Sequence, residues 1–259
     1  MTTTTKLQVQ PDPSVSGVKL NPRNNGPRDS SNGGFAAGTF AAFVGGTASV
    51  RLQARPPLGT PLTVTATGGV ASIHDGTRPI ATAKRVSPFV LEPPIVPSMD
   101  VAEDARRRHP FNHTRHALSD CVVCGPRRAD GMHVTPGSLN LPGRDDVLVA
   151  PFVPHEREAV DGIVRAEAVW GALDCPSFPG RLLRERKIGL LGELTAHVRR
   201  EITVGEQLVV VGWTIDEGTR SHRTATTIID ENDEVVASAH ATWVEPKHPR
   251  LVRFLGRFV

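Results

Sequence analysis

The stretches Ala48-Ser-Val-Arg-Leu-Gln-Ala54 and Leu194-Thr-Ala-His-Val-Arg-Arg200 share one strand-like pattern, and each precedes a similar turn. The two align when Gly59-Thr-Pro-Leu62 is placed on Gly205-Glu-Gln-Leu208. Self-similarity of this kind indicates a structural unit that occurs more than once. The sequence therefore predicts two copies of one unit in a single chain.

The same alignment extends to the other elements of the unit. Ile80-Ala-Thr-Ala-Lys84 falls on Val236-Ala-Ser-Ala-His240, with a longer hairpin before it in the second copy. Upstream, an apolar helical segment at 32–44, for which Asn32 is the expected N-cap, corresponds to the segment 165–174. Each copy is thus expected to contain one buried helix.

Short segments that alternate or are rich in β-branched residues follow the first helix, with Gly or Pro turns between them. These segments are 48–54, 62–65, 70–73 and 80–86. A helix followed by such a meander predicts an α+β unit with an antiparallel sheet. Because a single unit leaves a sheet edge open, we expect the copies to pair as an intramolecular pseudo-dimer that buries both helices.

We expect five parts along the chain. They are an irregular N-terminal segment with a short strand (1–31), a first unit (32–90), a linker (91–119), a second unit (120–246) and a basic C-terminal tail (247–259). The strand in the first part, Gly17-Val-Lys-Leu-Asn-Pro22, resembles Gly131-Met-His-Val-Thr-Pro136 in the second unit. The linker is rich in proline and arginine, which suits a long surface connection.

The composition is that of an ordinary globular protein. Hydrophobic residues make up 39% and charged residues 22%, which excludes fibrous, collagen-like and wholly disordered chains. The net charge of +3 and the absence of tyrosine argue against a nucleic-acid surface and favour an anionic small molecule. No apolar run approaches the roughly 18 residues of a spanning helix, and the N-terminus lacks a signal-peptide core. We therefore expect a cytoplasmic protein without stable membrane insertion.

Four motifs of the second unit follow one another in a characteristic order. They are Cys121-Val-Val-Cys-Gly-Pro126, Gly131-Met-His-Val134, Val147-Leu-Val-Ala-Pro-Phe152 and Gly162-Ile-Val-Arg-Ala-Glu-Ala-Val-Trp-Gly-Ala-Leu-Asp174. This order resembles that of hotdog-fold acyl-CoA thioesterases, whose single-domain members read C-F-x-C-G-P and then H-G-G through a helix to L-L-D-E. The first copy, from Gly33-Gly-Phe-Ala-Ala37 onward, resembles the N-terminal unit of double-hotdog members. The resemblance implies a tandem hotdog, in which two antiparallel sheets each wrap a central helix.

The resemblance also implies a composite active site. In this family a helix carboxylate acts on the thioester, as nucleophile or as general base for water, while an amide in the first turn of the partner helix binds the thioester oxygen. The carboxylate of H-G-G members lies nine residues beyond the histidine. Here that count leads from Arg165 to Asp174, but from Asn32 to Ala41. The second helix therefore keeps the acid, and the first has lost it.

The first helix keeps the other half of the site. Gly33 and Gly34 leave its first turn open to an acyl oxygen, whereas the second helix has Ala-Glu at that place. The predicted catalytic residues are thus Asp174, Gly33, Gly34 and Asn32, and the predicted reaction is hydrolysis of an acyl-CoA or acyl-carrier thioester. No cofactor is expected beyond the coenzyme A of the substrate.

Several further residues are candidates for substrate binding. They are the cationic side chains of Arg199, Arg200, Arg220, His222 and Arg223, together with Trp170 and Phe35 on the two helices. The cationic set has the charge to bind coenzyme A phosphates, and a solvated strand face is the alternative. His222 is also a candidate acid or base.

The run His109-x3-His113-x2-His116-x4-Cys121-x2-Cys124 contains the residue types that bind zinc. One Cys-x2-Cys pair without a second is a weak zinc signal, and the thioesterase resemblance accounts for the pair without a metal. We therefore expect no metal site. Cys175 has no histidine near it in sequence and is expected to be a small buried residue rather than a nucleophile.

Two other functions stay open. An acyl hydratase or dehydratase on the same fold needs a paired Asp and His at a helix entrance, and no D-x-N-P-x-H-like stretch occurs in this sequence. A non-catalytic acyl-binding protein would be favoured if Asp174 were exposed or salt-bridged. The tail, with apolar residues such as Leu251 and Phe254 between arginines, is expected to pack on the protein or a second chain, or to lie on a membrane. A homodimer of double-hotdog chains is therefore left open.

Overall fold

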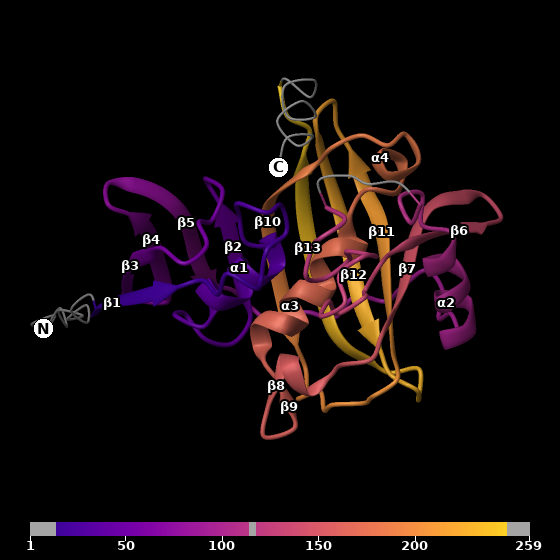
Figure 1. Cartoon of the computed structure of the whole chain (residues 1–259), viewed down its shortest axis with the longest axis horizontal. Helices are drawn as coiled ribbons and strands as arrows, with labels where there is room; N and C mark the ends of the chain where they lie inside the picture. Colours follow the sequence, from indigo (N-terminus) through magenta and orange to yellow (C-terminus); the bar gives the residue numbers. More distant parts are fainter. Residues whose placement is uncertain (1–13, 114–117, 248–259) are drawn as a thin grey trace, which may run out of the picture.

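The computed structural model describes residues 14–113 and 118–247 of the chain (Figure 1), so the predicted tail lies outside the described residues except for Lys247. The strands are β1 (Ser14–Lys19), β2 (Ala48–Leu52), β3 (Pro61–Thr67), β4 (Val70–Asp75), β5 (Arg78–Arg85), β6 (Gly137–Leu141), β7 (Arg144–Phe152), β8 (Ala159–Val160), β9 (Ile163–Val164), β10 (Leu190–Val198), β11 (Leu208–Glu217), β12 (Ser221–Ile229) and β13 (Val235–Val244). The helices are α1 (Gly33–Ala41), α2 (Met99–Arg107), α3 (Ala166–Asp174) and α4 (Gly180–Arg184), with short 3-10 helices η1 (Glu156–Glu158) and η2 (Cys175–Ser177).

One antiparallel sheet runs through both units. Its 11 strands lie in the order β1-β3-β4-β5-β2-β10-β13-β12-β11-β7-β6, so the two units join edge to edge between β2 and β10. Figure 1 shows α1 beside the N-terminal strands and α3 beside the C-terminal ones, and the two helices pack against each other. This is the predicted tandem hotdog, with the sheets of the two units continuous rather than separate.

The ladder between β2 and β10 reproduces the internal repeat. The sequence alignment places Ser49 on Thr195, and these two residues pair directly with each other. The flanking pairs are Ala48 with Ala196 and Val50 with Leu194. The alignment exchanges these two flanking pairs, which is the behaviour of a pseudo-twofold axis through the Ser49–Thr195 pair. The repeat in the sequence is therefore a repeat in space.

The next ladders follow the same correspondence. Ser49 pairs with Lys84 across β2 and β5, and Thr195 pairs with His240 across β10 and β13. Lys84 and His240 are the residues that the alignment matches. The longer hairpin of the second copy is thus accommodated beyond this point, between β12 and β13, without a change of register at the centre.

The central helices approach each other closely because both carry glycine at the contact. Asn32 begins α1, where its side-chain oxygen accepts the Phe35 N–H, and seven of the nine residues of the helix are buried. A Cβ added to Gly38 would lie 2.6 Å from the Cα of Glu167, and one added to Gly171 would lie 2.7 Å from the Phe35 ring. This packing sets the first turn of α1 against the last turn of α3.

Two segments differ from the prediction. The linker 91–119 was expected to be a long surface connection, but it contains α2, whose Ala102 and Ala105 pack in a small second core with residues of β7 and β11. Residues 131–136 form no strand. In the first unit β1 pairs with β3, and in the second unit the strand that pairs with the equivalent β11 is β7. The expected correspondence between 17–22 and 131–136 was therefore wrong.

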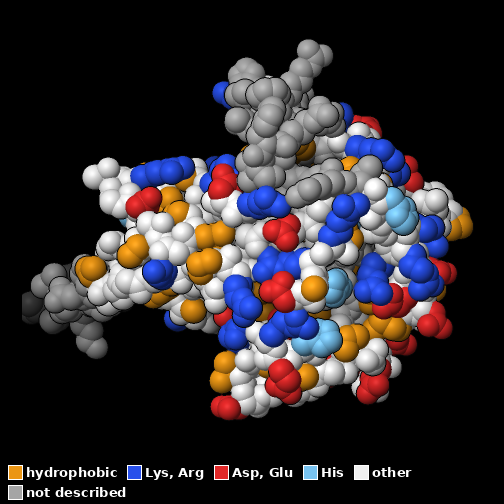
Figure 2. Space-filling model, in the orientation of Figure 1, with side chains coloured by type: hydrophobic (Ala, Val, Ile, Leu, Met, Phe, Trp, Pro, Cys, Tyr) orange, Lys and Arg blue, Asp and Glu red, His pale blue; other side chains and the backbone are white. Residues whose placement is uncertain are grey.

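The described surface carries both signs of charge. Figure 2 shows basic and acidic side chains interspersed over one face of the molecule. No helix within residues 14–113 and 118–247 has both the length and the apolar character of a membrane span.

Candidate active site

The carboxyl group of Asp174 lies at the junction of the two units. Asp174 is the last residue of α3 and only 3% exposed. Its Oδ2 atom accepts hydrogen bonds from the backbone N–H of Gly34 and from Nδ2 of Asn32, each at 2.9 Å. Its Oδ1 atom is buried and has no hydrogen-bond partner among the described residues. One oxygen of the carboxyl is therefore held by the other unit, and the second is free.

Asn32 serves both helices at once. Its Oδ1 caps α1 by accepting the Phe35 N–H at 3.0 Å, while its Nδ2 donates to Asp174. A side-chain amide has an acceptor and a donor at adjacent positions, so it can do both. This accounts physically for asparagine at the position where the resembling family has histidine.

Substitution of Asn32 is expected to separate these two tasks. Asn32→Ser retains a capping oxygen but loses the donor to Asp174. For the thioester hydrolysis expected from the sequence, we therefore expect turnover to fall about tenfold, with little change in stability. Asn32→Ala loses the cap as well and is expected to cost a further ~1 kcal/mol of stability. Turnover and thermal unfolding measured on both variants check this. Wild-type turnover in Asn32→Ser would show that the Asp174 contact is not needed.

Burial dominates the protonation of Asp174. It raises the pKa of the carboxyl from 3.8 to about 7, and the nearby Cys121 sulfur also raises it. The hydrogen bonds from Gly34 and Asn32 oppose the shift because they stabilise the carboxylate. With a pKa of about 7, the Asp174 carboxyl is partly protonated and partly ionised at neutral pH, as acid–base residues in active sites often are.

The two glycines at the start of α1 have different roles. A Cβ at Gly34 would lie 2.4 Å from the Trp170 carbonyl oxygen and 2.6 Å from Cβ of Asp174, so the helices could not approach as they do. A Cβ at Gly33 would meet the tip of the Leu191 side chain at 2.7 Å instead. The Gly33 N–H, at the positive end of the helix, has no hydrogen-bond partner in the described part of the chain. Gly34 orients the carboxyl, and Gly33 offers a free donor beside it.

Three sulfurs lie next to this carboxyl. The Sγ atoms of Cys121, Cys124 and Cys175 are all within 4.8 Å of one another. Nδ2 of Asn32 lies 3.8 Å from the sulfurs of Cys121 and Cys175. Hydrogen bonds from the Cys124 and Cys175 thiols, and from the backbone N–H groups of Cys124 and Val123, hold the pKa of the Cys121 thiol well below its ordinary value. Cys175 is therefore a member of a cluster rather than an isolated buried thiol.

The two histidines of the candidate zinc run that the structure describes, His109 and His113, do not join these cysteines. His109 is buried, and its Nδ1 contacts the Pro136 carbonyl oxygen at 2.6 Å. His113 is exposed, and His116 lies outside the described residues. Sequence reasoning missed the partner of the Cys-x2-Cys pair because Cys175 is far away in the chain. The one feature of the sequence that could have indicated this partner is that Cys175 directly follows Asp174, the predicted catalytic acid.

The predicted phosphate-binding side chains are not brought together. Arg199 donates to the Val235 carbonyl oxygen and Arg200 forms ion pairs with Glu206 and Asp230, near the hairpin end of β12 and β13. Arg220 donates to the Glu245 carbonyl oxygen at the opposite end of the same ladder. The expectation of one cationic cluster was wrong, because two long strands separate its members.

His222 and Arg223 point to opposite faces of β12. His222 is fully buried and contacts the Glu245 carboxyl at 3.0 Å, whereas Arg223 is exposed. Alternation along a strand requires this, so the two side chains cannot bind one phosphate group together. His222 lies in a cross-strand row with Trp243 and Leu191, and Leu191 abuts Gly33. The end of the ladder with Arg220 is thus the end nearer to Asp174.

Trp170 and Phe35 are core residues. They are 4% and 2% exposed, and the Phe35 ring packs where Gly171 leaves room in α3. They support the helix crossing that positions Asp174 instead of lining an open acyl-binding surface. Their assignment to substrate binding is corrected accordingly.

At the other end of the helix pair, the first helix has no acid at the corresponding position, where Ala41 stands. Glu167 of α3 lies at that end and forms an ion pair at 3.1 Å with Arg165, the N-cap residue of α3. The two ends of the pseudo-dimer therefore differ chemically, as the sequence predicts.

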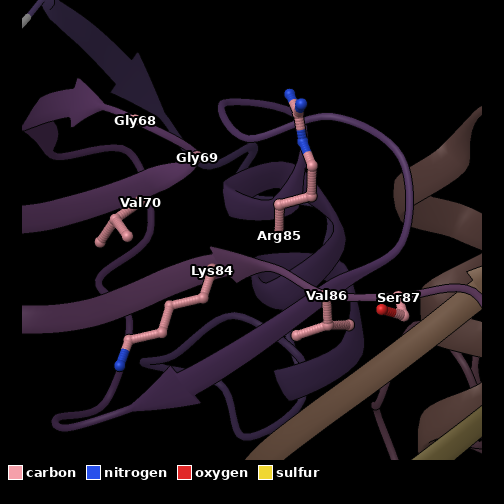
Figure 3. A pocket seen from close by; sticks show the side chains of 7 residues that line it. All are labelled: Gly68, Gly69, Val70, Lys84, Arg85, Val86 and Ser87. Atoms are coloured by element: carbon pink, nitrogen blue, oxygen red, sulfur yellow. The ribbon is translucent and has the colours of Figure 1, made fainter. Parts of the chain in front are cut away.

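Two surface hollows have other linings. One of about 560 Å3 is formed by Gly68, Gly69, Val70, Lys84, Arg85, Val86 and Ser87, and Figure 3 shows the Lys84 and Arg85 side chains pointing in different directions. The other, of about 450 Å3, is lined by residues around Arg200 and its acidic partners. Neither lining includes Asp174 or the first turn of α1.

Comparison with known proteins supports the architecture. No protein-family model matches the sequence, and no curated protein matches it either. Among solved structures, a conserved hot dog fold protein of unknown function from Alicyclobacillus acidocaldarius is similar at a TM-score of 0.59 and 9% identity, over 90% of this chain and 93% of that one.

Two mycobacterial structures show the same likeness. The tesB protein of Mycobacterium avium subsp. paratuberculosis matches at a TM-score of 0.58 and 10% identity, over 90% of this chain and 92% of that one. The acyl-CoA thioesterase II TesB2 of Mycobacterium marinum matches at 0.53 and 13% identity, over 90% and 94%. At these identities the likeness establishes the fold, and the chain is a tandem hotdog protein with thioesterases among its structural neighbours.

Proposed function

We propose that this protein hydrolyses an acyl-CoA or acyl-carrier thioester at Asp174. The observation that supports this most directly is a buried carboxyl of one unit held by N–H groups of the other unit, at the start of a helix. Anchoring one oxygen and leaving the other free orients the group for reaction. The coenzyme A or carrier thiol belongs to the substrate.

In this mechanism the thioester carbonyl oxygen accepts a hydrogen bond from the Gly33 N–H at the positive end of α1. Such a donor contributes about 3 kcal/mol to the stabilisation of the developing oxyanion. Oδ1 of Asp174 either attacks the carbonyl carbon or removes a proton from the water that attacks it. The carbon–sulfur bond then breaks, and the sulfur leaves as a thiolate that takes up the proton lost by water. On the nucleophilic route, water hydrolyses the acyl–Asp174 anhydride that remains.

A non-catalytic acyl-binding role is the alternative. An exposed or salt-bridged Asp174 would favour it, because such a carboxyl would be an ordinary surface or structural group. Asp174 is instead buried, and the hydrogen-bond donors on it are a backbone N–H and a side-chain amide. This environment favours chemistry at the carboxyl over a purely structural role.

The test presents the full-length protein with acyl-CoAs of increasing chain length and follows thiol release. Hydrolysis above the enzyme-free rate supports the proposal. No thiol release with any acyl-CoA or acyl-carrier protein contradicts it, and a change in enoyl absorbance without thiol release indicates a hydratase. After a single turnover in ¹⁸O-labelled water, ¹⁸O in the Asp174 carboxyl together with an unlabelled acid product would show nucleophilic attack, because hydrolysis at the Asp174 carbon of the anhydride leaves a protein oxygen in that product.

Arg220 and Arg200 provide a matched pair for coenzyme A recognition. Arg220 is exposed at the end of the ladder nearer to Asp174, whereas Arg200 is already paired with two carboxylates at the far end. We expect Arg220→Ala to raise KM about 5- to 10-fold, as for loss of one partly exposed charge-assisted hydrogen bond, with kcat unchanged. Arg200→Ala is expected to leave KM unchanged. A higher KM for Arg200→Ala than for Arg220→Ala would instead place the coenzyme A phosphates at the Arg200 end of the β12–β13 ladder.

A further inference from the structure

The three cysteines beside Asp174 are arranged as a set of metal ligands. Cys121 and Cys124 come from one turn and Cys175 from the residue after α3, yet their sulfurs lie within 4.8 Å of one another. Thiolates bound to one zinc ion at 2.3 Å lie about 3.8 Å apart, so small side-chain movements would bring these sulfurs onto one ion. A disulfide needs only two sulfurs and does not account for a third at a similar distance.

The side-chain amide of Asn32 lies beside two of these sulfurs. Its Nδ2 atom is 3.8 Å from Sγ of Cys121 and 3.8 Å from Sγ of Cys175. Donors directed at a sulfur stabilise the thiolate, which is the form that binds metal. The turn is closed by Gly125, whose N–H donates to the Cys121 carbonyl and whose missing Cβ would otherwise lie 2.5 Å from that oxygen. The backbone is thus folded to present both sulfurs of the pair to one point.

The chemistry of these ligands favours a cation of the zinc class. Cys121 is buried and Cys124 and Cys175 are half-buried, and Asn32 connects the cluster to Asp174. Zinc and similar borderline-soft cations prefer thiolate ligands, and three of them leave one position for water or a further ligand.

We propose that Cys121, Cys124 and Cys175 form a binding site for one thiophilic divalent cation of the zinc class. The site ties the turn at 121–125 to the end of α3, next to the residue on which hydrolysis is proposed to depend. Its existence does not rest on hydrolysis, because the three ligands and their spacing are independent of any substrate. The proposal replaces the expectation from sequence that the chain has no metal site.

The test measures zinc in the full-length protein, purified without chelator and with any affinity tag removed. We expect about one zinc ion per chain by elemental analysis, and replacement by Co²⁺ is expected to produce the sulfur-to-cobalt absorption of a thiolate site. Cys124→Ser and Cys175→Ser, which preserve side-chain size, are expected to weaken zinc binding at least ~100-fold. Thermal unfolding of the zinc-free variants verifies that each is folded.

His113→Ala is the matched control. His113 is exposed and belongs to the candidate His–Cys run. The variant is expected to keep its zinc if the three thiols are the ligands, and to lose it if the histidines of that run bind the metal. Loss of zinc from His113→Ala overturns the three-thiol assignment. So does a folded wild-type protein with three free thiols that takes up neither zinc nor cobalt. A disulfide between any two of the three sulfurs in protein kept under argon overturns it as well.

Discussion

Asp174→Asn is expected to lower turnover of the preferred acyl thioester by at least ~100-fold, the effect of removing a general base or nucleophile. The substitution keeps the shape of the side chain and an oxygen that accepts the N–H groups of Gly34 and Asn32. It removes the ability to attack or to take a proton. The loss is therefore expected in kcat with little change in KM, measured by thiol release over a range of substrate concentrations.

Glu167→Gln is the control for this prediction. Glu167 is a second carboxylate on the same helix, paired with Arg165 at the end of α3 that has no catalytic partner. Its substitution is expected to leave turnover unchanged. Near-equal turnover in wild type and Asp174→Asn would reject Asp174 as the catalytic group. Equal losses in both variants would indicate a general effect on the helix rather than chemistry at one carboxyl.

Gly34→Ala is expected to destabilise the protein by about 2–3 kcal/mol, within the range for overpacking a close contact. Its Cβ would meet the Trp170 carbonyl oxygen at 2.4 Å and the Cα of Gly171 at 2.9 Å, and these backbone atoms can move only if the helices separate. For a chain of this size we expect the melting temperature to fall by about 5–10 °C. Activity should fall as well, because the Gly34 N–H orients Asp174.

Gly33→Ala tests the same helix turn without the same clash. The added methyl meets the tip of the Leu191 side chain at 2.7 Å, which can rotate away, and Cβ of Leu191 at 3.2 Å, so we expect a loss of about 1 kcal/mol, smaller than for Gly34→Ala. Gly17→Ala, where the nearest atom is the Leu62 carbonyl oxygen at 3.9 Å, is the control for a glycine in ordinary contact. Thermal unfolding of the three variants checks the order. A Gly34→Ala protein as stable as Gly33→Ala would show that the helix contact is looser than described.

Much of the site was predictable because its signals are local. Capping chemistry identified Asn32 as the start of α1, and the resemblance to hotdog thioesterases supplied the nine-residue count that leads to Asp174. The repeat predicted that the helices would meet as a pseudo-dimer, which brings these residues together. What remained open was the hydrogen bonding between them, since that depends on where two helices cross to within a fraction of an ångström.

The sequence by itself determined the repeated unit, its strands and turns, and the unequal division of acid and glycines between the helices. The strands and turns follow from side-chain periodicity and turn chemistry, which act over a few neighbouring residues. The meaning of the acid and the glycines came from the resemblance to hotdog thioesterases. The tertiary structure alone decided that Cys175 meets Cys121 and Cys124, that Arg199 and Arg220 stand at opposite ends of a ladder, and that the Gly34 N–H holds Asp174. Such contacts join segments far apart in the chain, and they exist only once both helices and the continuous sheet have packed.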